Sequence, residues 1–355
     1  MSSYINQAFL SILSASEEDK RGLFIATANR LGVPIQNIEK DFWVCLVLDV
    51  LFNGQEKSSP RLLFKGGTSL SKAYSLISRF SEDIDITIFR EDLGLDMPFV
   101  ELEALSGKQQ RKYFEKIKRA SHEYICNRLK PHLQSIFDAL FREIRSNTQT
   151  PTIEIDPNDA SCQTLLLRYP SLSHSQSYVL PTVKIEAGAK SALDPHQYMT
   201  IYPYINEDLP DLDLKVNNVI TIEPARTFWD KIIILHGIRR WFDINGILRQ
   251  NGHRYSRHYY DVYQLLKSDV FNHMMSKQDL AIDCTKHAQM FFNSSSLDLQ
   301  AAYKGTFSIT PNQKMIQALK KDYQAMSGMI FATVPHFDDI IDVISTFEND
   351  LLNQG

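Results

Sequence analysis

The chain has 355 residues, of which 43% are hydrophobic and 23% charged, and its formal net charge at neutral pH is −4. This length and composition are ordinary for a folded protein of two or three modest domains. The net charge excludes a globally basic nucleic-acid binder, although it leaves local basic patches open. No apolar run approaches the roughly 20 residues of a membrane span, so we expect no association with a membrane.

Two further features indicate where the protein works. Its four cysteines are widely scattered and form no CxxC pair, which argues for reduced thiols and against a zinc site or a disulfide framework. The N-terminal residues lack the basic head and the small-residue cleavage site of a signal peptide. We therefore expect a cytoplasmic protein.

The first 60 residues predict two helices. Apolar positions recur at helical spacing over residues 4–30, and Gly32 and Pro34 then break the pattern. The second helix is expected to begin with Asn37 as its N-cap and to continue through an apolar body to Val50.

The next stretch predicts a strand, a glycine turn, a helix and a second strand. Apolar residues Leu62–Phe64 lead into the turn Gly66-Gly67-Thr68-Ser69, and the second strand begins at Asp83-Ile84-Asp85. Because strand side chains alternate with period two, the carboxylates of Asp83 and Asp85 point to the same face. Paired carboxylates facing a glycine turn are what a site for Mg²⁺ (or Mn²⁺) and a triphosphate needs. The alternative is a solvated Asp-x-Asp beside an ordinary helix.

The turn itself supplies groups that suit phosphate. Gly66 and Gly67 let backbone amides approach phosphate oxygens, and Thr68 or Ser69 can donate a hydroxyl hydrogen bond. Lys72 lies off the buried stripe of the following helix and can reach toward the mouth of the turn. We therefore predict nucleotide-binding roles for these five residues.

Residues from Ser106 to about Ile144 have a helical pattern that is locally basic. Between positions 108 and 130 two acidic residues, Glu115 and Glu123, stand among eight basic ones: Lys108, Arg111, Lys112, Lys116, Lys118, Arg119, Arg128 and Lys130. Such a charge run forms either a solvated face or a surface that meets a polyanion.

The character of the chain changes after residue 150. Alternating apolar positions predict strands over 152–156, 163–169, 178–188 and 197–205, separated by turn-rich segments. In the third of these strands, Glu186 is the best source of a third metal-binding carboxylate. Glu154 and Asp156 are its rivals, although a solvated face fits both of them better.

From Pro224 onward the pattern is helical nearly to the end, with strong helices over 225–240 and 258–268. A polar segment between them, residues 246–256, is expected to be a loop. Five arginines fall within residues 239–257, so this segment is a second candidate for contact with a polyanion. Strands in the first 205 residues followed by helices predict an α+β core with a mainly helical C-terminal domain.

The run GGTSLSKAY…RFSEDIDI resembles the AbiEii/AbiGii family of nucleotidyltransferase toxins, which includes the MenT toxins and belongs to the DNA polymerase β-like superfamily. Further segments are similar to the family: IEKDFWV, LPTVKIEAGAKS, ARTFWDKIIILH and RYSRHYYDVYQLL. The resemblance implies a polymerase β-like core of mixed sheet and flanking helices over 1–210. It also implies a helical domain over 211–355 that completes the active-site cleft.

The family pattern can be carried over residue by residue. Its glycine turn falls on Gly66, Gly67 and Thr68, and its metal-binding carboxylates fall on Asp83 and Asp85. The helical lysine that contacts the triphosphate matches Lys231, and a later catalytic aspartate matches Asp261.

Other roles for the matched residues stay open. Lys231 can instead be a solvated lysine, and Asp261 can simply pair with Arg257. Arg79, just before the Asp-x-Asp, is as consistent with a structural role as with a functional one. Arg226 can bind phosphate or pair with Asp230 one helical turn later.

The resemblance implies a magnesium-dependent toxin of a toxin–antitoxin or phage-defence system. Such an enzyme transfers nucleotides from an NTP to RNA, with the tRNA 3′ end as the expected acceptor, and blocks translation; its partners are NTP, tRNA and a cognate antitoxin. Three alternatives stay open: nucleotidyl transfer to, or phosphorylation of, a protein acceptor; an Asp-x-Asp glycosyltransferase; and a non-catalytic nucleotide- or RNA-binding protein.

Overall fold

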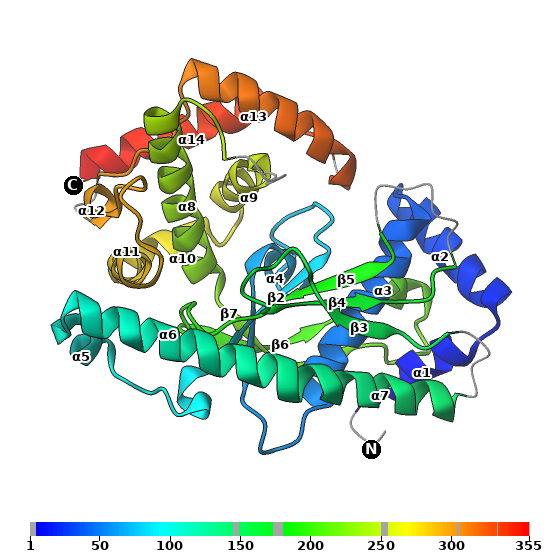
Figure 1. The fold of residues 1–355 in the computed structure, drawn as a ribbon. Helices are drawn as coiled ribbons and strands as arrows, with labels where there is room; N and C mark the ends of the chain where they lie inside the picture. Colours follow the sequence, from blue (N-terminus) through cyan, green and yellow to red (C-terminus); the bar gives the residue numbers. More distant parts are fainter. Residues whose placement is uncertain are drawn as a thin grey trace. The chain divides into compact units, whose positions relative to one another are not determined.

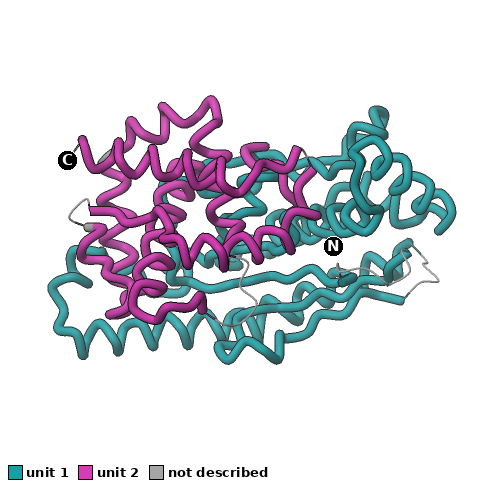
Figure 2. Tube along the Cα trace, turned by 90° about the horizontal axis from the view of Figure 1, so that it is seen from above, with its two compact units in different colours: residues 1–73, 81–222 teal, residues 74–80, 223–355 magenta. Residues whose placement is uncertain are grey.

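A computed structural model of the chain describes residues 5–144, 149–172, 180–249, 255–303, 306–331 and 333–354. Contacts divide the chain into two compact units, coloured separately in Figure 2. Unit 1 comprises residues 1–73 and 81–222, and unit 2 comprises residues 74–80 and 223–355. The sequence-based division into domains between residues 210 and 211 stays a prediction.

Unit 1 contains a mixed sheet with flanking helices (Figure 1). Its helices are α1 Gln7–Ser14, α2 Glu17–Leu31, α3 Ile35–Asn53, α4 Gly66–Lys72, α5 Phe99–Ala104, α6 Gly107–Tyr124 and α7 Lys130–Glu143, with 3-10 turns at Arg90–Leu93 and Tyr204–Asp208. Its strands are β1 Leu62–Lys65, β2 Asp83–Ile88, β3 Thr152–Ile155, β4 Thr164–Arg168, β5 Thr182–Glu186, β6 His196–Ile201 and β7 Val216–Ile222.

The described strands form one seven-stranded sheet in the order β3-β4-β5-β2-β1-β7-β6. Strands β1 and β2 pair antiparallel, whereas β2 pairs parallel with β5 and β1 pairs parallel with β7. The central position of β2 brings neighbours from distant parts of the sequence to both of its sides.

Helix α3 is buried along nearly its whole length in unit 1. Its Trp43 ring stacks on Tyr169 at 5.0 Å and on Phe141 of α7 at 6.3 Å between ring centroids. Such aromatic packing adds to the burial of apolar surface. Helices α3 and α7 are therefore fixed against each other beside the sheet.

The structure differs from the sequence-based expectations near the N-terminus. The helix expected over residues 4–30 is two helices, because the side chain of Ser16 accepts a hydrogen bond from the Asp19 amide and begins α2 anew. The expected start of the next helix at Asn37 is wrong, since α3 begins at Ile35 with Pro34 as its N-cap.

The strand expectations are largely confirmed. The first, second and fourth predicted strands correspond to β3, β4 and β6, and the third corresponds to β5, although its first two positions, 178 and 179, lie outside the described residues. Strand β7 was not anticipated, because Asn217 and Asn218 interrupt the apolar alternation and Asn218 has a positive φ of 59°.

The basic region is helical as predicted, and Figure 1 shows α6 and α7 as one long helix. Ser106 and Gln109 form a capping box at the start of α6. A π-helical turn over Ile125–Leu129 joins it to α7. Pro131, near the start of α7, cannot donate a backbone hydrogen bond. Its missing donor explains the local change from α-helical to π-helical hydrogen bonding at this point.

Unit 2 is mainly helical, as predicted for the C-terminal region. Its helices are α8 Pro224–Asn245, α9 Ser256–Leu266, α10 Phe271–Ser276, α11 Gln278–Phe292, α12 Leu299–Tyr303, α13 Gln313–Met326 and α14 Phe337–Gln354. The segment 74–80 belongs here, because the Phe80 amide donates to the Met329 carbonyl (2.7 Å) and the Phe331 amide donates to the Ser78 carbonyl (2.9 Å).

Two expectations about the environment can be compared with the structure. Of the helices formed by the described residues, none has the length and apolar character needed to span a bilayer. All four cysteines are free thiols, as the sequence predicted.

Candidate active site

The residues predicted as a glycine turn form the first turn of α4, which directly follows β1 and depends on glycine at position 66. Gly66 has a φ of +81°, a conformation that side chains with a Cβ rarely adopt. A Cβ there would lie 2.9 Å from Cγ of Asp85 and closer still to its Oδ2. The carboxylate of Asp85 therefore rests directly against the backbone at the start of α4.

Asp83 and Asp85 lie on one face of β2, as predicted. Both are partly exposed, whereas Ile84 between them is fully buried. In the parallel pairing with β5, Asp83 lies opposite Lys184 and Asp85 lies opposite Glu186. Paired residues of adjacent strands point to the same face, so this face presents three carboxylates and one ammonium.

Lys184 counteracts part of this negative charge. Its Nζ lies 2.5 Å from Oε1 of Glu186. Burial lowers the pKa of Lys184, but the Glu186 and Asp83 carboxylates outweigh that effect, so its pKa is raised and the ammonium stays charged. Glu186 thus stands beside Asp85, as required of a third carboxylate, but its carboxylate is paired with Lys184.

The rival carboxylates are less suitable. Glu154 lies on the edge strand β3 in an exposed ion pair with Arg168, at 3.1 Å. Asp156 accepts a hydrogen bond from the Asn158 amide at 2.9 Å and holds the turn after β3. Because β4 and β5 separate β3 from β2, neither rival is a direct neighbour of the carboxylate pair.

The donor chemistry of the β2 pair fits magnesium. Mg²⁺ commonly uses only one or two protein carboxylates and completes its octahedron with water and substrate phosphate. Across the described residues, no group of three or more His, Cys, Asp and Glu side chains is arranged to hold a metal ion. Asp83 and Asp85 would supply two carboxylates to such an ion, with phosphate oxygens as further ligands, and this role stays a prediction.

The hydroxyls of the turn are engaged within the chain. Thr68 Oγ1 lies 2.8 Å from Oγ of Ser81 and also donates to the carbonyl of Asp83. Ser69 Oγ donates to the carbonyl of Gly66 at 2.9 Å. Both side chains are buried; Thr68 ties the turn to the start of β2, and Ser69 closes the turn on itself. Their predicted contact with a nucleotide stays a prediction.

Lys72 is also internal. Its Nζ lies 2.6 Å from Oδ1 of Asp41 and 3.7 Å from the centre of the Tyr204 ring, and its side chain is only 3% exposed. Burial lowers the pKa of Lys72, but the Asp41 carboxylate more than offsets this, so the pKa is raised. The structure places this ammonium where it joins α4 to α3, and its predicted contact with triphosphate stays a prediction.

Helix α3 contributes supporting residues that the sequence analysis did not single out as site residues. Three consecutive charged residues, Glu39, Lys40 and Asp41, are buried in this largely apolar helix. Lys40 Nζ pairs with Glu82 at 2.6 Å, immediately before Asp83. Buried charges persist only when paired, so a charged triplet inside an apolar helix is the signal that could have revealed them.

A second group of charged residues lies within unit 2. Asp261 is fully buried and receives two hydrogen bonds from Arg79, Nε to Oδ1 at 2.7 Å and Nη2 to Oδ2 at 2.8 Å. Lys231 Nζ lies 2.8 Å from the same Oδ2. The sequence left open whether Asp261 has a catalytic role or only forms an ion pair, with Arg257 as the expected partner. The structure pairs Asp261 with Arg79 and Lys231, and its catalytic role stays a prediction.

Burial and charge act in opposite directions in this cluster. Burial raises the pKa of Asp261, but Arg79 and Lys231 outweigh it and hold that pKa well below its usual range. The pKa of Lys231 is lowered, by burial first, although Asp261 opposes the shift. Arg79 and Lys231 thus share one carboxylate, and the charge of Arg79 adds to burial in lowering the pKa of Lys231.

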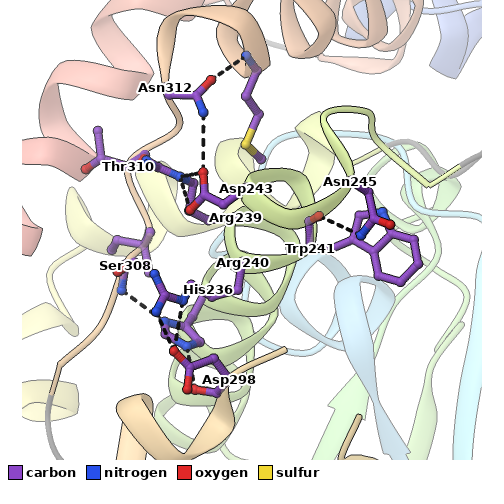
Figure 3. Close-up of polar contacts among 12 residues, drawn as sticks. His236, Arg239, Arg240, Trp241, Asp243, Asn245, Asp298, Ser308, Thr310 and Asn312 are labelled. Carbon is purple, nitrogen blue, oxygen red and sulfur yellow. Dashed lines mark hydrogen bonds and ion pairs between the residues drawn. The ribbon is translucent and has the colours of Figure 1, made fainter. Parts of the chain in front are cut away.

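The arginines of segment 239–257 are largely occupied within unit 2. Arg239 Nε bonds Asp243 at 2.9 Å, and Arg240 pairs with Asp298 (Figure 3). Arg249 lies over the Trp241 ring at 4.2 Å. Residues 250–254 of the segment, including its fourth arginine, lie outside the described residues. Arg226, another candidate for phosphate, lies 3.4 Å from Asp230 and 2.6 Å from Asp283.

Comparison with known proteins identifies a family and a similar solved structure. The family model described as "Nucleotidyl transferase AbiEii toxin, Type IV TA system" matches residues 49–343. The chain is similar in structure to MenT4, a nucleotidyltransferase toxin from Mycobacterium tuberculosis H37Rv, at 11% sequence identity, with 93% of this chain and 97% of that chain covered and a TM-score of 0.44. None of the curated protein sequences matches the chain.

Proposed function

Because the chain belongs to the family of AbiEii nucleotidyltransferase toxins of type IV toxin–antitoxin systems, we propose that it transfers a nucleotide from an NTP to the 3′ end of tRNA and thereby blocks translation. The observation that carries the proposal is the pair Asp83 and Asp85 on one face of β2, with the Asp85 carboxylate against the Gly66 turn. We place the protein in the cytoplasm with a cognate antitoxin, and its four free thiols agree with that compartment.

The proposed reaction is an in-line displacement at the α-phosphorus of the NTP. The 3′-hydroxyl oxygen forms a bond to this phosphorus, the bond to the oxygen bridging to the β-phosphate breaks, pyrophosphate leaves, and the hydroxyl proton passes to water. Asp83 and Asp85 would hold Mg²⁺ (or Mn²⁺), which supplies charge stabilisation at the phosphate oxygens. Lys184 keeps Glu186 in place beside them.

Lys231 and Asp261 are proposed as further catalytic residues, on the family match alone. Asp261 orients the Lys231 ammonium through the 2.8 Å contact and balances part of its charge. Replacing Lys231 with Met is expected to raise KM for NTP or to lower kcat. Unchanged kinetics in this variant would leave Lys231 with a structural role only.

A transfer assay tests the proposal directly. Purified protein is incubated with Mg²⁺, total tRNA and each of the four NTPs labelled at the α-phosphate, and label is measured in RNA and in protein after separation. We expect label in tRNA with the wild type and none with Asp85→Asn. Label in protein alone would favour a protein acceptor instead.

Two controls address the other classes of function. Transfer from UDP-sugars with Mn²⁺ in place of NTPs would favour a glycosyltransferase. Absence of transfer from any NTP, together with undiminished growth inhibition by Asp83→Ala in cells, would favour a non-catalytic binding protein. Either result would overturn the proposal.

A further inference from the structure

Basic residues dominate the exposed surface of α6 from Lys108 to Arg119, with Glu115 as the one acidic residue among them. Its buried side is formed by Tyr113, Ile117, Ser121 and Tyr124. Its exposed basic residues are Lys108, Arg111, Lys112, Lys116, Lys118 and Arg119. With two glutamates on the same helix, α6 has an excess of about four positive charges at neutral pH, in a chain whose net charge is −4.

These six cations are not used to hold the described structure together. Within the described residues none of them takes part in an ion pair, and Arg111 Nε bonds only the Gly107 carbonyl of its own helix, at 3.2 Å. Arg239 and Arg240 differ, because each is bonded to a carboxylate. Among the described residues, α6 therefore has the larger set of cations outside ion pairs of the two segments proposed to meet a polyanion.

The basic helix is connected to the end of the sheet that carries the carboxylates. Gln163 Nε2 donates to Ser121 Oγ of α6 at 2.7 Å. Gln163 directly precedes β4, where Thr164 lies opposite Glu186, and Glu186 lies opposite Asp85 on β2. Two strand spacings, about 10 Å, therefore separate the start of β4 from Asp85.

The helix is long enough to follow a nucleic-acid backbone. Its 18 residues span about 27 Å at the usual helical rise. Lys108, Lys112, Lys116 and Arg119 recur at intervals of three and four residues, so they line one face. Phosphate neutralisation by such residues supplies most of the sequence-independent affinity for nucleic acids.

We propose that the basic face of α6 binds the phosphate backbone of the RNA acceptor, next to the end that reaches Asp83 and Asp85. This inference rests on the proposed function, because an RNA whose 3′ end is modified must extend away from the reacting atoms. The face contains no exposed large apolar residue, whereas protein interfaces have apolar or aromatic anchors at their centre. Its chemistry therefore fits phosphate better than an acidic protein.

The test compares two triple variants of the full chain with equal changes in charge. K112Q/K116Q/R119Q removes three positive charges from the basic face of α6. K57Q/K314Q/K321Q removes three from exposed lysines on the α3–β1 loop and on α13. Binding of fluorescently labelled total tRNA is measured over a range of NaCl concentrations, and KM for tRNA and kcat are measured in the transfer assay. Circular dichroism confirms that both variants fold.

We expect the α6 variant to bind tRNA on the order of ten- to a hundredfold more weakly, with a salt dependence shallower by about two to three units of log Kd per log salt. KM for tRNA rises accordingly, kcat at saturating tRNA changes less than about twofold, and the control variant resembles the wild type. An α6 variant with unchanged KM for tRNA, the result expected of a docking site for an acidic protein, would overturn the inference. A wild type that labels no RNA would instead overturn the proposed function, so the two failures are distinguishable.

Discussion

Asp83 and Asp85 on β2 and Asp261 on α9 are carboxylates in very different surroundings. The β2 pair is partly exposed, and its position is set by strand register and by the glycine turn. Asp261 is fully buried, and both of its oxygens are bonded to cations. Carboxylates of the first kind can accept new ligands, whereas one of the second kind stabilises the fold that contains it. Loss of the first should therefore change activity with little effect on stability, whereas loss of the second should lower stability in addition to any effect on activity.

The largest expected effect comes from the β2 pair. Replacing Asp83 or Asp85 with Asn should slow label transfer by about a thousandfold or more, because metal-bound carboxylates support several kcal/mol of transition-state stabilisation. The free energy of unfolding, measured with urea, should change by less than about 1 kcal/mol. Asp96→Asn, at an exposed position, is the matched control and should leave transfer intact. Near-normal transfer by either site variant contradicts the assignment.

The second prediction concerns Asp261. Its replacement with Ala leaves Arg79 and Lys231 buried without their common partner, so the free energy of unfolding should fall by about 3–5 kcal/mol. Asp338→Ala breaks an exposed 2.8 Å pair with Lys320 and should cost about 1 kcal/mol or less. Urea denaturation followed by circular dichroism compares the two. Equal losses in both variants would remove the distinction drawn between buried and exposed carboxylates.

The third prediction separates backbone conformation from contact with the site. Gly66→Ala should destabilise unit 1 by about 1–3 kcal/mol through its positive φ and should also displace the Asp85 carboxylate, lowering transfer. Gly32 has a similar φ of +66° but has open space around its Cα. Gly32→Ala should therefore cost stability without loss of transfer. If both variants retain full transfer, contact between Gly66 and Asp85 is unimportant for activity.

The smallest expected effect is the pH dependence that arises from His236, which is also fully buried in unit 2. Its Nδ1 accepts from the Ser308 amide and its Nε2 donates to the Asp298 carbonyl, both at 3.0 Å (Figure 3). Burial lowers the pKa of His236, with Arg240 adding to the shift and Asp298 and Glu348 opposing it. The neutral ring is therefore the folded form.

The sign of the pH effect follows from this lowered pKa. The unfolded chain binds the proton below about pH 6.5 and the folded chain does not, so stability is complete above pH 6.5 and is lost on acidification, by up to about 1.4 kcal/mol per pH unit. The free energy of unfolding, measured with urea at pH 7.5, 6.5 and 5.5, should fall as the pH falls. His236→Gln should reduce this slope of unfolding free energy against pH. His273→Gln, at an exposed position on α10, should not change the slope; identical slopes in both variants contradict the role of His236.

The parts of the structure that sequence could predict are those encoded locally. The glycine turn, the carboxylate pair on β2 and the helices α6 and α8 each follow from a short pattern, and the structure has the two carboxylates on one face. The break between α1 and α2 at Ser16 was missed because the apolar spacing continues across it. Strand β7 was missed because its asparagines disturb the alternation.

Long-range pairings could not be predicted in the same way. Arg79 and Asp261 are 182 positions apart, and no local pattern indicates that two such residues form a buried ion pair. The ammonium of Lys72 was expected near the turn, but its partner Asp41 comes from a preceding helix whose packing is set by the tertiary fold. The sequence shows which residues are charged, but it does not show which of them form ion pairs with one another.

Sequencing of tRNA 3′ ends tests the central claim most directly. Total tRNA is incubated with Mg²⁺, all four NTPs and either the wild type or Asp85→Asn, and every 3′ end is then sequenced. We expect added nucleotides on tRNA ends with the wild type and unmodified ends with Asp85→Asn. Unmodified ends with the wild type, or identical additions by both proteins, would contradict it.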